Sequence, residues 1–301
     1  IWCDWSSDVC SSDLEIMDSF FKCADIAGEV YKNNMPGIKH SRKKYKGIVI
    51  DDMKISNDNN PYHKKAGRYV LIDPISPIFE DDYALMDVLT KYLKLLVKNK
   101  TKRKSKLNVL IVGLGNKDYT PDSLGPKVID KVDVNYHLKN EKIKKKNIKT
   151  YVSAFSPGVM ASTGFESSNM IKAIVENEKI DVVIAIDALA TRTIKRLNRV
   201  IQLTDTGIAP GSGVGNYRKA LDEDYIKIPV IAIGVATVID TAAIVLETLN
   251  NMKIDENKQG EIASNVMENI DEKIIMSTKD IDFEIKSIAK LIANSINLAF
   301  N

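Results

Sequence analysis

Short apolar runs alternate with amphipathic segments through the middle of the chain. The apolar runs are rich in β-branched residues and bounded by turn residues, which predicts buried strands at 107–112, 150–155, 180–186, 200–203 and 228–233. Residues spaced three and four apart predict helices between several of them, at 122–132, 166–178 and 237–250. Apolar strands that alternate with helices indicate the α/β class, with a mixed, mostly parallel sheet flanked by helices.

The regions on either side of this centre add further elements. Apolar residues recur at helical spacing from Leu85 to Leu96 and from Ile281 to Ala299, which predicts two amphipathic helices. We also predict a helix at 15–31 and strands near 47–55 and 67–73. Residues 1–14 differ from the rest in character, and we interpret them as a non-native or disordered segment that precedes a single α/β domain at 15–301.

Composition and charge exclude several classes of protein. The chain has 301 residues, 28% of them charged, and a net charge of +3, which is typical of a globular protein rather than a fibrous or fully disordered one. All three cysteines lie within the first 23 residues, so a disulfide scaffold is excluded and a reducing, cytoplasmic compartment is expected. The basic runs at 98–106 and 139–149 lack interleaved aromatic residues, and we interpret them as solvated linkers. We therefore expect no direct nucleic-acid partner and no membrane association.

Two aspartates stand where predicted strands meet turns. Thr120 and Pro121 form a helix-start signal that places Asp122 in the first helical turn, where the helix dipole favours the ionised carboxylate. Asp187 directly follows a run of five apolar residues, where partial burial would raise its pKa. Ligands of open α/β sheets bind beyond the carboxyl ends of the strands, so the two acids could share one crevice and divide acid–base work. The alternative is that both are ordinary turn and helix-start residues.

A polar, glycine-rich loop at 204–219 is the third candidate feature. Its glycines would let the backbone approach a ligand closely, although an ordinary surface loop is equally consistent with the composition. Arg192, Arg218 or Lys219 could bind an acidic substrate side chain. The candidate substrate-binding or site-shaping residues from this loop and from the two aspartate segments are Gly115, Asn116, Thr120, Arg192, Asp205, Gly211, Gly213, Asn216 and Arg218.

Several common catalytic and binding motifs are incomplete or absent in the sequence. The dinucleotide fingerprint breaks at Asp118, where a third glycine is needed, and the P-loop, HExxH and GxSxG motifs do not occur. His40, His63 and His137 lie outside the central motifs, which disfavours a histidine triad or a zinc site. We therefore predict no metal and no cofactor, and we regard carboxylates as the best candidate catalysts.

Four sequence blocks carry a resemblance to a known family. GLGNKDYTPDSLGP, IDALATR, TDTGIAPGSGVGN and IPVIAIGVATVID resemble the motifs of the germination protease of endospore-forming bacteria. The family's two catalytic aspartates then correspond to Asp122 and Asp187. The resemblance implies an atypical aspartic endopeptidase without a cofactor, with a fold similar to the hydrogenase maturation proteases and the phosphorylase/hydrolase-like proteins.

The same resemblance implies a biological setting. The expected substrates are the small acid-soluble spore proteins that coat DNA, cleaved between glutamate and an apolar residue during germination. The enzyme is expected to be a zymogen that loses a short N-terminal propeptide by autocatalytic cleavage, to form a homotetramer, and to reside in the cytoplasm of the forespore and spore core. Two alternatives stay open: a metal-dependent protease of the hydrogenase-maturation type, and a non-catalytic α/β protein that binds an anion or a partner.

Overall fold

The computed structural model describes residues 37–60, 64–102, 104, 106–140, 148–209, 219–252, 258, 262, 265 and 274–300. Segment 1–14 and the helix predicted at 15–31 lie outside this part of the chain. The strands are β1 (Ile38–Tyr45), β2 (Ile48–Ile55), β3 (Gly67–Asp73), β4 (Leu107–Gly113), β5 (Thr150–Phe155), β6 (Val182–Thr191), β7 (Ile201–Thr204), β8 (Val230–Asp240) and β9 (Ile275–Met276). The helices are α2 (Tyr83–Lys100), α3 (Leu124–Ile129), α4 (Met160–Thr163), α5 (Ser167–Asn177), α6 (Glu223–Ile226), α7 (Thr241–Asn251) and α9 (Ile281–Phe300), with short 3₁₀ turns η1 (Thr120–Asp122), η2 (Tyr136–Asn140) and η3 (Ile194–Arg196).

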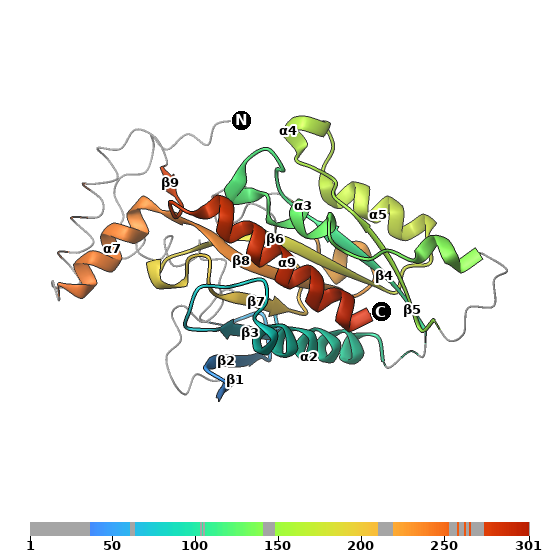
Figure 1. The fold of residues 1–301 in the computed structure, drawn as a ribbon, viewed down its shortest axis with the longest axis horizontal. Coiled ribbons are helices and arrows are strands. Elements are labelled where there is room, and N and C mark those ends of the chain that lie inside the picture. The colour runs from blue at the N-terminus through green and yellow to red at the C-terminus, as the bar shows by residue number, and fades with distance from the viewer. Residues whose placement is uncertain are drawn as a thin grey trace.

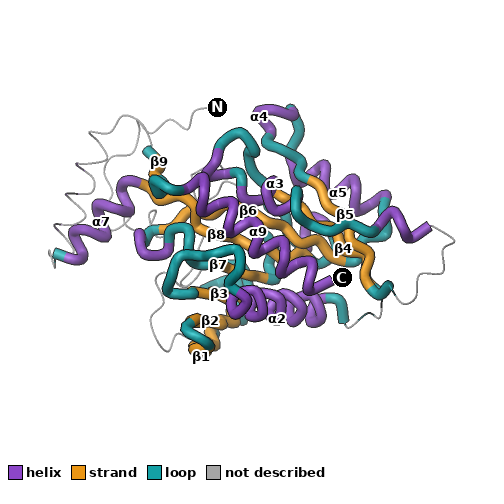
Figure 2. Tube along the Cα trace, viewed as in Figure 1, coloured by secondary structure: helices purple, strands orange, loops and turns teal. Residues whose placement is uncertain are grey.

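In the described residues the strands form one mixed sheet between helical layers (Figures 1 and 2). Its order is β1-β2-β3-β7-β8-β6-β4-β5, and β9 pairs with the far end of β8. The mixed α/β architecture predicted from the sequence is therefore confirmed. Each predicted central strand corresponds to an observed one, and β1 and β9 are additional strands that the sequence pattern did not indicate.

Parallel pairing is confined to one half of the sheet. β5, β4, β6 and β8 pair in parallel, whereas the other pairings described are antiparallel. Most strands do run in the same direction, as predicted: β1, β3, β4, β5, β6 and β8. Most pairs of neighbouring strands are nevertheless antiparallel. One cause of antiparallel pairing is the two-residue turn between β1 and β2, Lys46-Gly47, in which both residues have positive φ (47° and 84°). Such a turn joins antiparallel strands.

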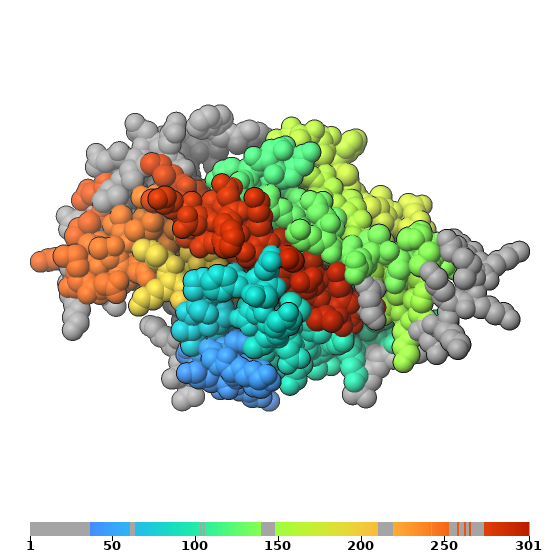
Figure 3. All heavy atoms as spheres, in the orientation of Figure 1, coloured from blue at the N-terminus to red at the C-terminus, as the bar shows by residue number. Residues whose placement is uncertain are grey.

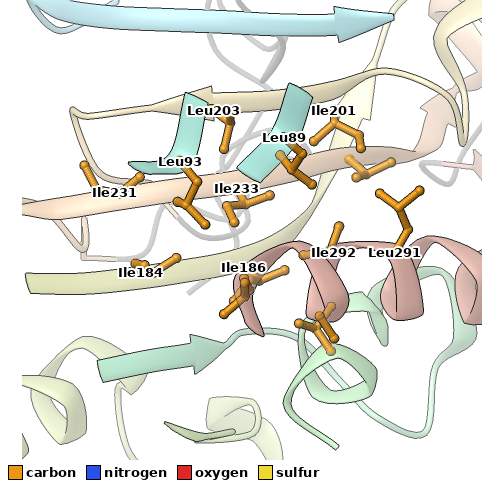
Figure 4. Packing of buried hydrophobic residues seen from close by; sticks show 14 of the residues in the cluster. Leu89, Leu93, Ile184, Ile186, Ile201, Leu203, Ile231, Ile233, Leu291 and Ile292 are labelled. Carbon is orange, nitrogen blue, oxygen red and sulfur yellow. The ribbon is translucent and has the colours of Figure 1, made fainter. Parts of the chain in front are cut away.

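Helices cover both faces of the sheet. α9 lies between α2 and α3 on one face, as Figure 3 shows, and α5 and α6 pack on the opposite face. In Figure 4, side chains of α2 and α9 interdigitate with those of β6, β7 and β8; the labelled residues are Leu89, Leu93, Ile184, Ile186, Ile201, Leu203, Ile231, Ile233, Leu291 and Ile292. Burying one such side chain contributes about 1.5–3 kcal/mol, so this layer supplies much of the stability of the parallel half.

β6 and β8 run on beyond the end of β4, the neighbour of β6. β4 ends at Gly113, opposite Ile186, whereas β6 continues to Thr191, paired with Ile239 of β8. The helix predicted from Thr237 is therefore wrong at its start, because residues 237–240 belong to β8 and α7 begins only at Thr241. The β-branched Val238 and Ile239 pair with β6, and Ile239 also pairs with β9, which favours the strand; Thr237 falls at a bulge in the pairing with β6. β8 leads to α7 at the left of Figure 1.

Candidate active site

Asp122 lies in η1, the short turn between β4 and α3. The sequence predicts that a helix starts at Thr120 and Pro121 with Thr120 as its N-cap; this is wrong, because Tyr119 holds the N-cap position of η1 and the helix α3 begins only at Leu124. Pro126 explains the difference. In a continuous helix from Pro121 it would stand in the helix interior, where proline has no N–H to donate and its ring clashes with the carbonyl of Asp122. Starting α3 at Leu124 places Pro126 in the first turn, where proline is tolerated.

Backbone from the end of β4 passes directly beside Asp122. The N–H of Asn116 donates to Oδ2 of Asp122 at 2.8 Å. Gly115 has φ +109°, and a Cβ on it would lie 2.0 Å from the carbonyl oxygen of Asp122. Gly115 is therefore required for the close approach, and Asn116 orients the carboxylate through its main chain. The side-chain oxygen of Asn116 accepts the N–H of Asp118 at 3.0 Å, which stabilises the same loop.

Two side-chain hydrogen bonds hold η1 against the rest of the protein. The hydroxyl of Thr120 donates to Oδ1 of Asp282 in the first turn of α9, at 2.8 Å. The hydroxyl of Thr237, in β8, donates to the carbonyl oxygen of Pro121 at 2.6 Å. Thr120, a predicted site residue, thus attaches η1 to α9. Sequence reasoning missed Thr237 and Asp282; the one available signal was a hydroxyl within the apolar run of β8.

Asp187 lies within β6 and is almost fully buried, with 5% of its surface exposed. It pairs with Gly234 of β8, one position beyond Ile186, which pairs with the last residue of β4. Oδ1 of Asp187 accepts the N–H of Ala188 at 2.9 Å. The sequence placed Asp187 at the end of its own strand; the structure instead places it just past the end of the neighbouring β4, because β6 continues.

The two aspartates belong to the same edge of the parallel strands. β4 and β6 are parallel neighbours, so their carboxyl ends point the same way. The N–H of Leu114 donates to the carbonyl oxygen of Ile186 at 2.8 Å, which ties the chain leaving β4 to the position just before Asp187. η1 in turn contacts both β6 and β8. The structure therefore brings Gly115, Asn116, Thr120, Asp122 and Asp187 into one region.

Asp205 lies at the opposite edge of these strands. β7 runs antiparallel to β8, so the segment after Thr204 leaves at the amino edge. Oδ1 of Asp205 accepts the N–H of Arg68 at 2.7 Å, and the N–H of Asp205 donates to the carbonyl oxygen of Arg68 at 3.2 Å. Asp205 therefore joins β7 to β3 and is not part of the region around Asp122. By register it lies three positions from Asp187 along the strands, about 10 Å at 3.3 Å per residue.

The remaining candidates are dispersed. Arg192 follows β6 directly, five positions past Asp187, or about 16 Å along the strand. Nζ of Lys219 lies 3.8 Å from the ring centroid of Tyr225, and the carbonyl oxygen of Lys219 accepts from the hydroxyl of Ser168 at the start of α5, at 2.8 Å. His40 pairs with Asp51 at 2.7 Å in the first two strands. The predicted site residues outside the described part of the chain are Gly211, Gly213, Asn216 and Arg218, and His63 also lies outside it.

The described residues contain neither a cluster suited to a metal ion nor a helix suited to span a membrane. Among these residues no three or more His, Cys, Asp or Glu side chains gather in a way that could hold a metal ion. Within the same residues, every helix is too short or too polar to cross a lipid bilayer.

Comparisons with known proteins identify the family. The family model described as germination protease matches residues 19–255. A germination protease of Caldanaerobacter subterraneus subsp. tengcongensis is 36% identical over 91% of this chain and 91% of its own length. One from Clostridium perfringens strain SM101 is 35% identical over 89% of this chain and 90% of its own length. One from Bacillus subtilis strain 168 is 40% identical over 71% of this chain and 59% of its own length.

A solved structure is also similar to this chain. It is a nickel–iron hydrogenase maturation protease from Thermococcus kodakarensis, 15% identical, with a TM-score of 0.31, and the match covers 67% of this chain and 98% of that one. The family model and the curated relatives together cover most of the sequence. The chain belongs to the germination protease family.

Proposed function

We propose that this protease cleaves peptide bonds with water and a pair of aspartates, Asp122 and Asp187. The observation that carries the proposal is the convergence of η1 and β6 at one edge of the parallel strands, where η1 contacts β6 and β8. Both acids also stand in the sequence blocks that resemble the family's catalytic motifs. The geometry and the sequence blocks together support an aspartate pair at this edge.

The environments of the two carboxyl groups support different roles. The N–H of Asn116 donates to Asp122, and a hydrogen bond from a backbone N–H stabilises an ionised carboxylate. Asp187 likewise accepts a backbone N–H, from Ala188, but only 5% of its surface is exposed whereas Asp122 is half-buried, and the deeper burial disfavours the charged form of Asp187. We therefore assign Asp122 as the general base and Asp187 as the general acid. Two groups held in opposite protonation states are what acid–base hydrolysis requires.

In the proposed reaction Asp122 accepts a proton from water as the water oxygen attacks the peptide carbonyl carbon. Asp187 donates its proton to the carbonyl oxygen, and the tetrahedral intermediate forms. The C–N bond then breaks as Asp122 passes its proton to the leaving nitrogen and Asp187 takes a proton back from a hydroxyl of the intermediate, giving a carboxylic acid and an amine. One water is consumed, and both aspartates are again in their starting protonation states.

We propose the small acid-soluble spore proteins as substrates, cleaved between glutamate and an apolar residue during germination. The family membership of the chain supports this proposal. On the same ground we propose a zymogen that removes its own N-terminal propeptide, assembles as a homotetramer and acts in the spore core.

The test uses the purified full-length chain and a recombinant small acid-soluble spore protein, with products sequenced by mass spectrometry. Wild type should shorten its own N-terminus and cleave the substrate after glutamate, with and without a chelator. Asp122→Asn and Asp187→Asn should do neither. Loss of activity in chelator, restored by nickel or zinc, would instead favour the metal-dependent alternative. Full activity of either Asn variant would refute the aspartate pair.

A further inference from the structure

A fully buried hydroxyl connects β8 to the turn that carries Asp122. Thr237 has 0% of its surface exposed, and its Oγ1 donates to the carbonyl oxygen of Pro121 at 2.6 Å. That carbonyl belongs to the peptide unit that leads into Asp122, so the hydrogen bond fixes the orientation of the backbone at the aspartate. A buried hydroxyl without a partner costs free energy, so Thr237 suits this otherwise apolar stretch because Pro121 accepts from it.

The same strand also lies against the second aspartate. Gly234 of β8 pairs with Asp187, and Thr237 stands three positions further along, about 10 Å at 3.3 Å per residue. β8 therefore contacts the backbone of Asp187 by strand pairing and the turn that carries Asp122, at Pro121, by the hydroxyl of Thr237. A shift of η1 relative to β8 would change the separation of the two carboxyl groups.

Further hydrogen bonds connect β8 to the start of α9 and α9 to η1. The carbonyl oxygen of Thr237 accepts from Oγ of Ser277 at 2.6 Å. Ser277 lies four positions before α9, whose first turn holds Asp282, and Asp282 accepts from Thr120 of η1 at 2.8 Å. β8 is therefore connected to η1 by a second route, through Ser277 after β9 and Asp282 in the first turn of α9. The position of η1 thus depends on two independent attachments, one to β8 and one to α9.

We infer that Thr237 is a positioning residue that sets the separation of Asp122 and Asp187, an inference that rests on the proposed aspartate mechanism. Thr237 does not touch the substrate in this account. It acts through Pro121, and its hydroxyl rather than its shape is the functional group.

The test compares Thr237→Val, which keeps the shape and loses the donor, with Thr237→Ser, which keeps the donor. Thr237→Val should lower kcat at least about tenfold with a KM within about twofold, since small misplacement of catalytic groups lowers rate steeply. The two limbs of its pH–kcat profile should also move relative to each other, because coupling between carboxyl groups depends on their separation. Thr237→Ser should restore kcat to within about threefold of wild type and restore the profile.

Thr101→Val is the matched control. Thr101 is also buried, and its hydroxyl donates to a main-chain oxygen, that of Val97 at 2.8 Å, at the end of α2. This variant should change thermal stability without changing kcat or the pH profile. If Thr237→Val and Thr101→Val reduce activity equally, with no restoration by Thr237→Ser, the positioning role is refuted.

Thr120→Val tests the second attachment at a more accessible position, so it serves even if Thr237→Val does not fold. It should lower kcat by about threefold or more, with the same kind of change in the pH profile. An unchanged kcat and profile would overturn the inference. Failure of the mechanism itself is distinguishable, because Asp122→Asn and Asp187→Asn would then keep activity, whatever Thr237→Val does.

Discussion

The two edges of the parallel strands use similar residues for different purposes. At the carboxyl edge, a backbone N–H, a glycine with positive φ and a buried hydroxyl all act on the short turn that holds Asp122. At the amino edge, Asp205 accepts the backbone N–H of Arg68, and Lys65 pairs with Asp222 at 3.0 Å and with Asp224. Carboxylates at the amino edge therefore join neighbouring segments of the chain. Strand direction separates the two groups, because an acid after an antiparallel strand emerges at the other edge.

The largest difference between the edges should appear when acids are replaced by amides. Asp122→Asn and Asp187→Asn should each lower kcat/KM by about 10³-fold or more, because each removes a group that transfers a proton. Asp205→Asn is the same chemical change at the amino edge, and its amide oxygen can still accept from Arg68. It should keep kcat/KM within about twofold, as expected for a group outside the reaction. Steady-state kinetics on a glutamate-containing peptide measures all three, and equal losses would erase the distinction between edges.

Replacing one glycine at each edge should separate effects on stability from effects on catalysis. Gly115→Ala places a Cβ 2.0 Å from the carbonyl oxygen of Asp122, and Gly67→Ala places one 2.2 Å from Cγ2 of Thr206 at the amino edge. Both glycines have positive φ, so both variants should lose about 1–3 kcal/mol of stability. Gly115→Ala should also lose about 10²-fold in kcat, because η1 must move.

Chemical denaturation at fixed pH measures the stabilities of these two glycine variants, and kinetics at a temperature where both are folded measures kcat. A Gly67→Ala enzyme as impaired as Gly115→Ala, at equal stability, would show that the amino edge also controls the reaction.

The smallest effect concerns a tyrosine at the amino edge. The hydroxyl of Tyr69 donates to the carbonyl oxygen of Lys65 at 2.8 Å and accepts from Thr206 at 3.2 Å. Tyr69→Phe should cost about 1 kcal/mol of stability and leave kcat unchanged, since the bond is far from the acids. A change in kcat without a change in stability would contradict this.

The same tyrosine predicts a pH dependence of stability. Burial raises the pKa of Tyr69 above its ordinary value, although the hydrogen bond from Thr206 opposes the shift. The folded state therefore holds its proton where the unfolded chain releases it, so this contribution to stability is complete below the unfolded pKa and declines as pH rises through the folded one. Unfolding free energies measured at rising alkaline pH should decline less steeply in Tyr69→Phe than in wild type.

The sequence predicted much of the fold because its signals are local. Buried strands such as β4 and β5 are continuous apolar runs, and α2 and α9 show helical spacing over several turns. Strand direction was not predictable in the same way, since it depends on which strands become neighbours. β7 illustrates this: its short apolar run marks a strand, but only its place between β3 and β8 makes it antiparallel.

The candidate site was predictable only in part for the same reason, since the sequence alone does not show which strands become neighbours. Asp122 was selected by the helix-start signal that follows a predicted strand, Asp187 by its place directly after an apolar run, and the structure brings their segments to one edge. Asp205 was selected by the glycines near it and lies at the other edge. Thr237 was assigned to a helix, because an apolar segment with a threonine near its end fits either structure until its neighbours β6 and β9 are known.

The pH dependence of kcat/KM for the wild-type enzyme in the presence of chelator tests the aspartate pair most directly. Catalysis by one ionised and one protonated carboxyl group predicts a bell-shaped profile whose two limbs belong to the pair, with full activity retained in chelator. A rate that stays level from acidic to alkaline pH, or one that chelator abolishes, would contradict it.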